Sequence, residues 1–165
     1  MGIMSVEVPS VEELLTMTEP ACYGDDVSSE GTRGGALHLS SVLPAVSNAI
    51  GCPMPTAVHP DPKRLQGALG IPDATSVVVA LVDGLGYWNL NMRLGHAPYL
   101  RALMNDTANQ RPIATCMPST TVAAMSTFGT GTCPGMTGMT GYTQLNPKTD
   151  EICQLISFKN AIPPL

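Results

Sequence analysis

The stretch SVVVALVDGLGYWNL, residues 76–90, decides what fold to expect. Its apolar run, residues 77–82, lies between Pro72 upstream and Gly84 downstream. A continuous β-branched run of this length is typical of a strand buried on both faces, as in a parallel sheet covered by helices. The run ends abruptly at Asp83. A buried strand needs no acid at its tip, whereas a metal site often does.

Patterns on either side of this run predict further elements. Four segments have helical spacing or composition, and one has the composition of a second short strand: helices at 37–51, 62–70, 87–106 with a break near Gly95–Pro98, and 120–131, and a strand at 111–117. The order strand, helix, strand, helix fits a right-handed crossover unit. We therefore expect an α/β fold, a parallel-sheet α/β/α sandwich.

The bulk composition narrows the class of protein. The 165 residues are 44% hydrophobic and 13% charged, which is enough for one domain with a real core. The net charge is −5 and no Lys/Arg cluster occurs, so we expect neither a nucleic-acid groove nor binding to an anionic membrane. No apolar run approaches the roughly 18 residues of a membrane span.

The N-terminal segment differs from the rest of the chain. Residues 1–37 carry seven of the thirteen acidic residues, namely Glu7, Glu12, Glu13, Glu19, Asp25, Asp26 and Glu30. We expect an acidic, flexible segment at 1–37, with one short helix that begins at an N-cap Ser10 and has Glu13 at the capping-box position. The remaining residues, 38–165, form the predicted domain.

The cysteines indicate the cellular compartment. Five cysteines at irregular spacing, with no C-x-x-C pair, argue against a disulfide framework and against a thiolate zinc site. Free thiols are typical of a reducing cytosol. The first basic residue is Arg33, so a positively charged leader region is missing from this N-terminus. We therefore predict a cytoplasmic location.

Two predicted strand ends carry polar residues that can form a site. Asp83 ends the first strand, and Ser119, Thr120 and Thr121 follow the second at a helix start. Because ligands gather at the carboxyl ends of parallel strands, these groups are expected to meet. The hydroxyls have two interpretations, both open at this point. They cap the helix, or one of them is a nucleophile activated beside a metal held by Asp83.

The residues from Val77 to Tyr142 resemble the alkaline phosphatase superfamily. Within it they are similar to the type I phosphodiesterase / nucleotide pyrophosphatase group, and more narrowly to the actinobacterial alkaline phosphatase family protein type. The resemblance rests on three stretches: VVVALVDGLGYWNL, GHAPYLRALM and MPSTTVAAMSTFGTGTCPGMTGMTGY. It implies the N-terminal part of an alkaline-phosphatase-type catalytic domain, incomplete at the C-terminus.

The resemblance also implies roles for individual residues. Asp83, in its D-G dipeptide, corresponds to the family's first metal ligand. Thr121 lies three residues after Pro118 and nine before Thr130, which is the spacing of the family's nucleophile and metal-bound hydroxyl. The implied reaction is hydrolysis of a small phosphorylated substrate, a nucleotide being one candidate, by two divalent ions of the zinc type. The amide of Val122 is a candidate donor to the phosphoryl oxygen.

This chain departs from the family pattern in three respects. Ala124 stands where the nucleotide-cleaving members usually have an asparagine that binds a phosphoryl oxygen, and Thr137 stands where a histidine is common. All three histidines, at 38, 59 and 96, precede the nucleophile segment, whereas the family draws further Asp and His ligands from downstream. We therefore expect the remaining metal ligands beyond Leu165 and little catalysis by these 165 residues alone.

Other interpretations compete with this one. The chain could instead be a non-catalytic truncated or degenerate paralogue, at most a weak anion-binding α/β module. A dinucleotide fold is disfavoured because Asn89 stands where the third glycine of the fingerprint is needed. His59 and Asp61 could form a metal pair, but polar groups at the surface of a proline-rich loop are the simpler expectation.

Overall fold

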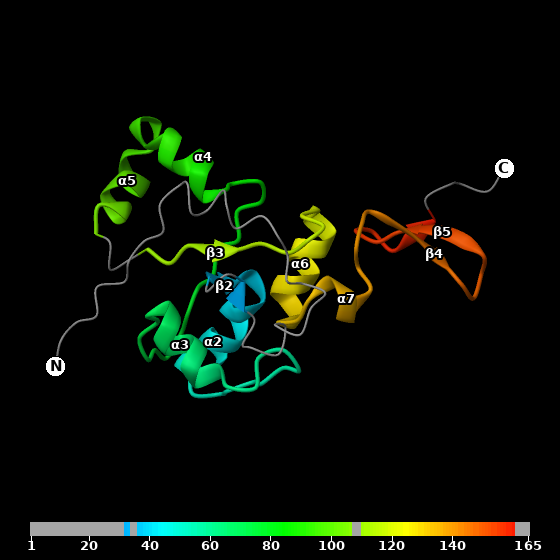
Figure 1. The fold of residues 1–165 in the computed structure, drawn as a ribbon, viewed down its shortest axis with the longest axis horizontal. Coiled ribbons are helices and arrows are strands. Elements are labelled where there is room, and N and C mark those ends of the chain that lie inside the picture. The colour runs from blue at the N-terminus through cyan, green and yellow to red at the C-terminus, as the bar shows by residue number, and fades with distance from the viewer. Residues whose placement is uncertain (1–31, 34–35, 107–109, 161–165) are drawn as a thin grey trace.

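The computed structural model describes residues 32–33, 36–106 and 110–160, which form helices and two small sheets, the second of which extends away from the helices beyond α7 (Figure 1). The predicted helix that begins at Ser10 lies outside these residues. The first sheet has the order β1-β2-β3, formed by Thr32–Arg33, Ala36–His38 and Ile113–Ala114. The second has the order β4-β5-β6, formed by Thr143–Asn146, Glu151–Gln154 and Lys159–Asn160.

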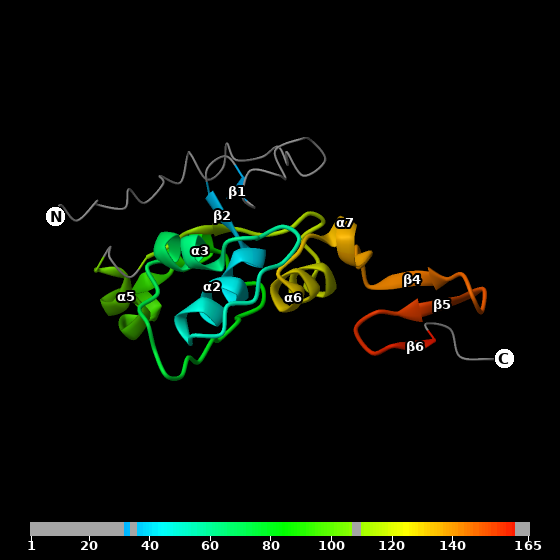
Figure 2. The same cartoon turned by 90° about the horizontal axis from the view of Figure 1, so that it is seen from below.

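The sheets differ in strand direction. In the first, β2 runs parallel to β3, with Leu37 opposite Ile113, and β1 is antiparallel to β2. The second is an antiparallel meander in which Thr143 faces Gln154. Figure 2 shows this meander on the far side of α7 from the first sheet. The chain is thus a mixed α/β protein with small parallel and antiparallel sheets, and the layered sandwich is not shown.

Helices occur in each of the four regions predicted from residue 37 onward, although residues 37 and 38 of the first belong to β2. The described part of the chain contains η3 Leu39–Ser41, α2 Val42–Ala49, α3 Pro62–Leu69, α4 Tyr87–Met92, η4 Leu94–His96, α5 Pro98–Met104, α6 Thr121–Thr130 and α7 Pro134–Thr137. The expected break near Gly95–Pro98 corresponds to η4. Within these described residues, no helix has both the length and the apolarity needed to cross a bilayer.

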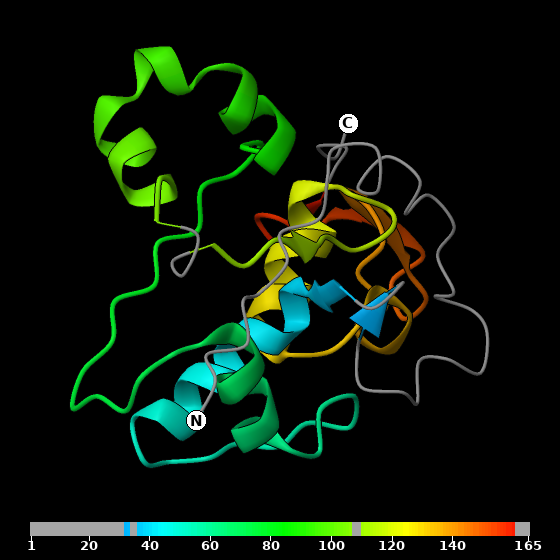
Figure 3. The same cartoon turned by 60° about the vertical axis from the view of Figure 1, so that its left-hand side comes forward.

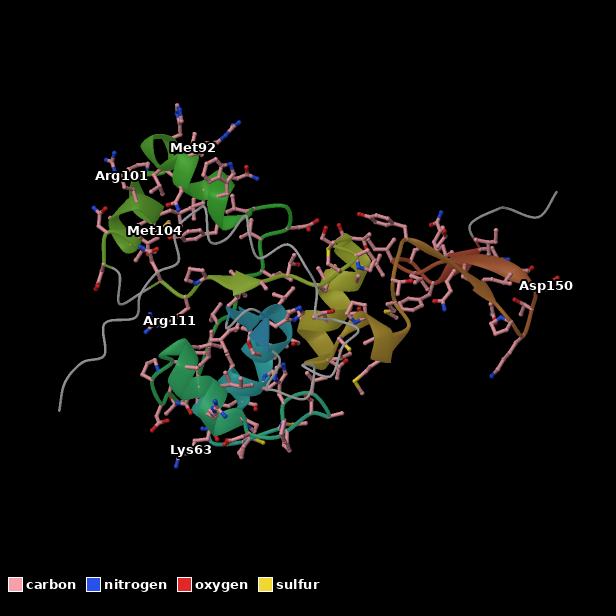
Figure 4. All side chains as sticks on the ribbon, viewed as in Figure 1. Lys63, Met92, Arg101, Met104, Arg111 and Asp150 are labelled. Carbon is pink, nitrogen blue, oxygen red and sulfur yellow. The ribbon has the colours of Figure 1, made fainter. Side chains whose placement is uncertain are left out.

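Local signals explain where the helices begin and end. The side chain of Asp61 accepts a hydrogen bond from the amide of Arg64 at 3.1 Å, which caps α3, and Pro62 occupies the first helical position. The same helix ends at Gly70, whose φ is +66°. The guanidinium of Arg111 lies against Gly70, and Figure 4 shows Arg111 between β3 and α3.

The core lies where α2 meets α3, η3 and α6. Its buried apolar side chains are small or medium in size: Leu39, Ala45, Ala49, Val58, Leu65, Cys116, Val122 and Ala123. The alanines of α2 let the neighbouring helices approach closely. Cys116, which lies within the predicted strand at 111–117, is also buried. This core therefore holds the start of α6, where the candidate nucleophile lies.

The predicted central strand at 77–82 is wrong for this structure. The segment is extended but belongs to neither sheet, and Val78 and Val82 are 95% and 60% exposed. Figure 3 shows the chain passing from α3 to α4 with no strand arrow. An apolar run becomes a strand only where neighbours satisfy its backbone groups. Among the described residues β3 takes β2 as its parallel neighbour, and no backbone hydrogen bond holds 77–82.

His59 is buried in the core, so its expected position at the surface is also wrong. It is 2% exposed, because the loop folds back where its amide donates to Thr56 Oγ1 at 3.0 Å. Its Nε2 lies 2.8 Å from Ser40 Oγ, which lies 3.1 Å from Nδ1 of His38. The Nδ1 of His59 is buried without a hydrogen-bond partner in the described part of the chain. Burial, followed by the nearby His38, lowers the pKa of His59 from 6.5 to about 4.

The lowered pKa of His59 predicts that acid destabilises the fold. The unfolded chain takes up a proton near pH 6.5 and the folded chain near pH 4, so stability is complete above pH 6.5 and falls between these values. Since one pKa unit corresponds to about 1.4 kcal/mol, the loss is on the order of 3 kcal/mol. Titration of the imidazole carbon-bound protons by NMR should show His59 titrating near pH 4. A midpoint close to 6.5 would contradict this expectation.

A matched comparison isolates the contribution of His59. His59→Gln and His96→Gln each remove one imidazole, but His96 is exposed in η4. The free energy of unfolding, measured by urea at pH 7 and at pH 4.5, should differ less between the two pH values in His59→Gln than in wild type. The pH effect should be unchanged in His96→Gln.

Candidate active site

Asp83 lies at a sharp turn after the apolar run. The turn includes Gly84, whose φ of +69° is in the left-handed region that glycine occupies without strain. A D-G pair is a strong turn signal for this reason. The side chain of Asp83 is exposed, so its carboxylate is accessible to a substrate or an ion.

Thr120 caps helix α6. Its backbone is extended, with φ −88° and ψ 154°, and its Oγ1 accepts a hydrogen bond from the amide of Ala123 at 3.2 Å. Its carbonyl accepts the first intrahelical bond, from Ala124, at 2.8 Å. Such a cap contributes about 1 kcal/mol. The open question of which hydroxyl caps the helix is therefore answered, and the hydroxyl of Thr121 is free for another partner.

The structure places Thr121 in contact with Asp83. The Thr121 hydroxyl donates a hydrogen bond to Oδ2 of Asp83 at 3.1 Å, although 38 residues separate the two in sequence. The second predicted strand is confirmed in shorter form as β3, and the chain leads from β3 to the start of α6. The two predicted site residues are thus neighbours, while their catalytic roles stay predictions.

Tyr142 is a third member of this cluster that the sequence patterns did not single out. Its phenol donates a hydrogen bond to Oγ1 of Thr121 at 2.9 Å. The residue directly precedes β4, and its carbonyl accepts a hydrogen bond from Leu155 at 2.8 Å. No spacing rule predicts a contact across 21 residues of helix, turn and loop. The one available signal was its position at the end of the stretch that carries the family resemblance.

The start of α6 also provides backbone donors. The first amides of a helix have no carbonyl partner within the helix, and the N-terminus carries roughly half a positive charge. The amide of Ala123 is used by Thr120, but that of Val122 has no acceptor in the described part of the chain. The side chain of Val122 is buried, which anchors this turn of the helix. The amide of Val122 therefore has no hydrogen-bond acceptor among the described residues.

The described residues do not make a complete metal site. Within the described ranges, no group of three or more His, Cys, Asp or Glu side chains is placed to hold an ion. Asp83 and Thr121 offer oxygen donors suited to a divalent cation, yet a catalytic zinc usually has about three protein ligands. The histidines do not supply the rest, because His59 is buried against Ser40 and His96 is exposed in η4. The oxygen donors of Asp83 and Thr121 suit a divalent metal ion, but two ligands are fewer than a catalytic zinc site usually has.

Comparison with known proteins identifies the family. The model of the type I phosphodiesterase / nucleotide pyrophosphatase family matches residues 77–160, half of the chain. This range begins at the apolar run and includes the three residues of the hydrogen-bonded cluster. No curated protein and no solved structure matches the chain. The family consists of phosphodiesterase hydrolases that are typically metal-dependent. The chain belongs to the type I phosphodiesterase / nucleotide pyrophosphatase family.

Proposed function

We propose that this chain carries the nucleophile segment of a metal-dependent phosphoric ester hydrolase, with Thr121 as the nucleophile. The observation that supports this role best is the environment of its hydroxyl. Thr120 already caps the helix, so Thr121 Oγ1 is available between an acceptor, Asp83, and a donor, Tyr142. A hydroxyl beside a carboxylate at a helix N-terminus is suited to attack phosphorus.

The proposed chemistry follows from these contacts. Thr121 Oγ1 forms a bond to phosphorus, and the bond from phosphorus to the leaving oxygen breaks, with the electron pair leaving on that oxygen. The Thr121 hydroxyl already donates a hydrogen bond to Asp83 Oδ2, with 3.1 Å between the two oxygens, so an acceptor for its proton is in place. The free amide of Val122 would donate to a phosphoryl oxygen as negative charge builds on it. Water then hydrolyses the phosphorylated threonine.

Asp83 is also the proposed ligand of a divalent cation such as Zn²⁺. A cation bound there would make the Thr121 hydroxyl more acidic. The proposal assigns its remaining ligands to polypeptide other than the described residues. The exposed apolar side chains of Val78 and Val82 support a further covering element on this side of the site. The substrate class is a small phosphorylated molecule, with nucleotides the leading candidates by family membership.

A covalent adduct tests the proposal. The full-length gene product would be incubated with Zn²⁺ and bis(4-nitrophenyl) phosphate. The reaction would be quenched in acid and the protein analysed by peptide mass spectrometry. We expect a nitrophenyl phosphate adduct on Thr121. Steady release of nitrophenolate without that adduct, or an adduct on another residue, would contradict the assignment.

Two variants and the short chain complete this test. Ser119→Ala removes the exposed neighbouring hydroxyl and should leave the adduct in place, whereas Thr121→Val should lose it. The 165-residue chain assayed alone is expected to turn over little diester. Robust turnover by this chain would show that the ligands it contains are sufficient.

A further inference from the structure

Tyr142 lies at one end of a hydrogen-bonded chain through the candidate nucleophile. Its phenol donates to Thr121 Oγ1 at 2.9 Å, and Thr121 donates to Asp83 Oδ2 at 3.1 Å. We infer that Tyr142 positions the nucleophile, holding Thr121 Oγ1 in the orientation from which it attacks phosphorus. This inference rests on the proposed function of Thr121 and extends it by one residue.

The geometry of a hydroxyl group explains why the two contacts fix Thr121. The group has one hydrogen and two lone pairs. Asp83 takes the hydrogen and Tyr142 occupies one lone pair, so a single lone pair of Thr121 stays available for phosphorus. A threonine side chain otherwise divides between rotamers, because its hydroxyl finds more than one partner. Two partners from different parts of the chain select one rotamer.

Tyr142 is itself held in place by the second sheet. Its carbonyl accepts from Leu155 at 2.8 Å, and the next residue, Thr143, pairs with Gln154 in the β4–β5 ladder. Figure 1 shows this meander beyond α6 and α7, with β4 starting near α7 and leading away from it. Figure 4 shows Asp150 at its distant tip, so the tyrosine lies at the base of the meander. Tyr142 is exposed and Thr121 is partly exposed, so the hydroxyl of Thr121 is not sealed from solvent by its partner.

The phenol also has a consequence for the second chemical step. When water attacks the phosphorylated threonine, its oxygen bonds to phosphorus and the bond from phosphorus to Thr121 Oγ1 breaks. The electron pair stays on Oγ1, where a donated hydrogen bond from Tyr142 stabilises the charge. Asp83 returns to Oγ1 the proton that it accepted from Thr121 in the first step, and the proton that the attacking water loses passes to solvent. Tyr142 donates a hydrogen bond throughout and keeps its own proton.

The test measures the rotamer of Thr121 and needs no turnover. Three-bond couplings from the Thr121 methyl carbon to its backbone nitrogen and carbonyl carbon report the χ1 populations by NMR. In the 165-residue chain we expect the couplings of a single rotamer. In Tyr142→Phe they should move to averaged values, while Tyr99→Phe, which alters an exposed tyrosine on α5, should leave them unchanged. Unchanged couplings in Tyr142→Phe would overturn the inference.

A reciprocal variant guards against a general disturbance of the fold by Tyr142→Phe. Thr121→Val keeps the shape of the side chain and removes the acceptor, so the Cζ chemical shift of Tyr142 should move. The same shift should stay fixed in Ser119→Ala, and a Cζ shift unaffected by Thr121→Val would count against the contact. An adduct on Thr121 with unaltered couplings in Tyr142→Phe would defeat this inference alone. Altered couplings without any adduct on Thr121 would defeat the proposed function alone.

Discussion

Thr121→Ala should lower the rate of phosphodiester hydrolysis by a factor of about a thousand or more, because it removes the attacking atom. The measurement is nitrophenolate release from bis(4-nitrophenyl) phosphate with Zn²⁺, using the longest polypeptide that the coding sequence yields. The cap of α6 is Thr120, and the Thr121 side chain makes no capping hydrogen bond. We therefore expect the free energy of unfolding to change little in Thr121→Ala, so that lost activity reflects lost chemistry.

Ser119→Ala is the matched control for this variant. It removes a hydroxyl two residues away, from an exposed position before the cap. Its rate should stay within a few-fold of wild type. A Thr121→Ala protein that keeps most of the wild-type rate would contradict the nucleophile assignment, and an equal loss in both variants would point to a disturbed helix start instead.

Gly131→Ala should destabilise the fold by about 3 kcal/mol. Gly131 ends α6 with φ +62°, a conformation that costs an L-residue about 1 kcal/mol or more. An added Cβ would also lie 2.9 Å from side-chain carbons of Pro44 and Thr56. Overpacking of this kind typically costs a further 1–3 kcal/mol. Urea unfolding at pH 7 measures the total.

Gly138→Ala separates the two contributions. Gly138 ends α7 with φ +71°, yet an added Cβ there meets nothing within 4 Å. This variant should lose only the conformational part, about 1 kcal/mol. Equal losses of unfolding free energy in the two variants would contradict this expectation. They would show that Pro44 and Thr56 move aside for the added methyl group at no energetic cost.

The position of Gly131 explains why the site and the core are linked. Its carbonyl accepts a hydrogen bond from Thr56 Oγ1 at 2.8 Å, and Thr56 Oγ1 itself accepts one from the amide of His59 at 3.0 Å. Helix α6 is thus held at its C-terminus by the loop that buries His59. At its N-terminus the same helix presents Thr121. Loss of this support is expected to affect the candidate site through the helix.

Features that depend on near neighbours could be predicted from the sequence. The helices at 62–69 and 121–130 begin at a hydroxyl or carboxylate cap and end at glycine, and these signals act within about four residues. The break between α4 and α5 follows from Gly95 and Pro98 for the same local reason. The family could also be recognised, since its motifs are read along the chain.

Strand pairing could not be predicted in the same way. The run at 77–82 has the composition of a buried strand, yet in this structure β2 takes the place beside β3. A strand exists only where another segment satisfies its backbone groups, and composition does not say which segment that is. The β4–β6 meander was not predicted for a related reason. Its strands are mostly polar and largely exposed, so no hydrophobic pattern marks them.

The sequence by itself determined the family, the helix boundaries and the two residues, Asp83 and Thr121, that end one segment and begin the next. Each of these depends on the identity of residues and on contacts along the chain. Only the tertiary structure decided that Thr120 rather than Thr121 caps α6, that His59 is buried, and that Tyr142 reaches the nucleophile. The cap is a local bond from Ala123 to Thr120, and three adjacent hydroxyls left its choice open in the sequence. The other two outcomes depend on which distant groups meet, and hydrogen bonds between residues 19 to 38 positions apart leave no periodic trace in the sequence.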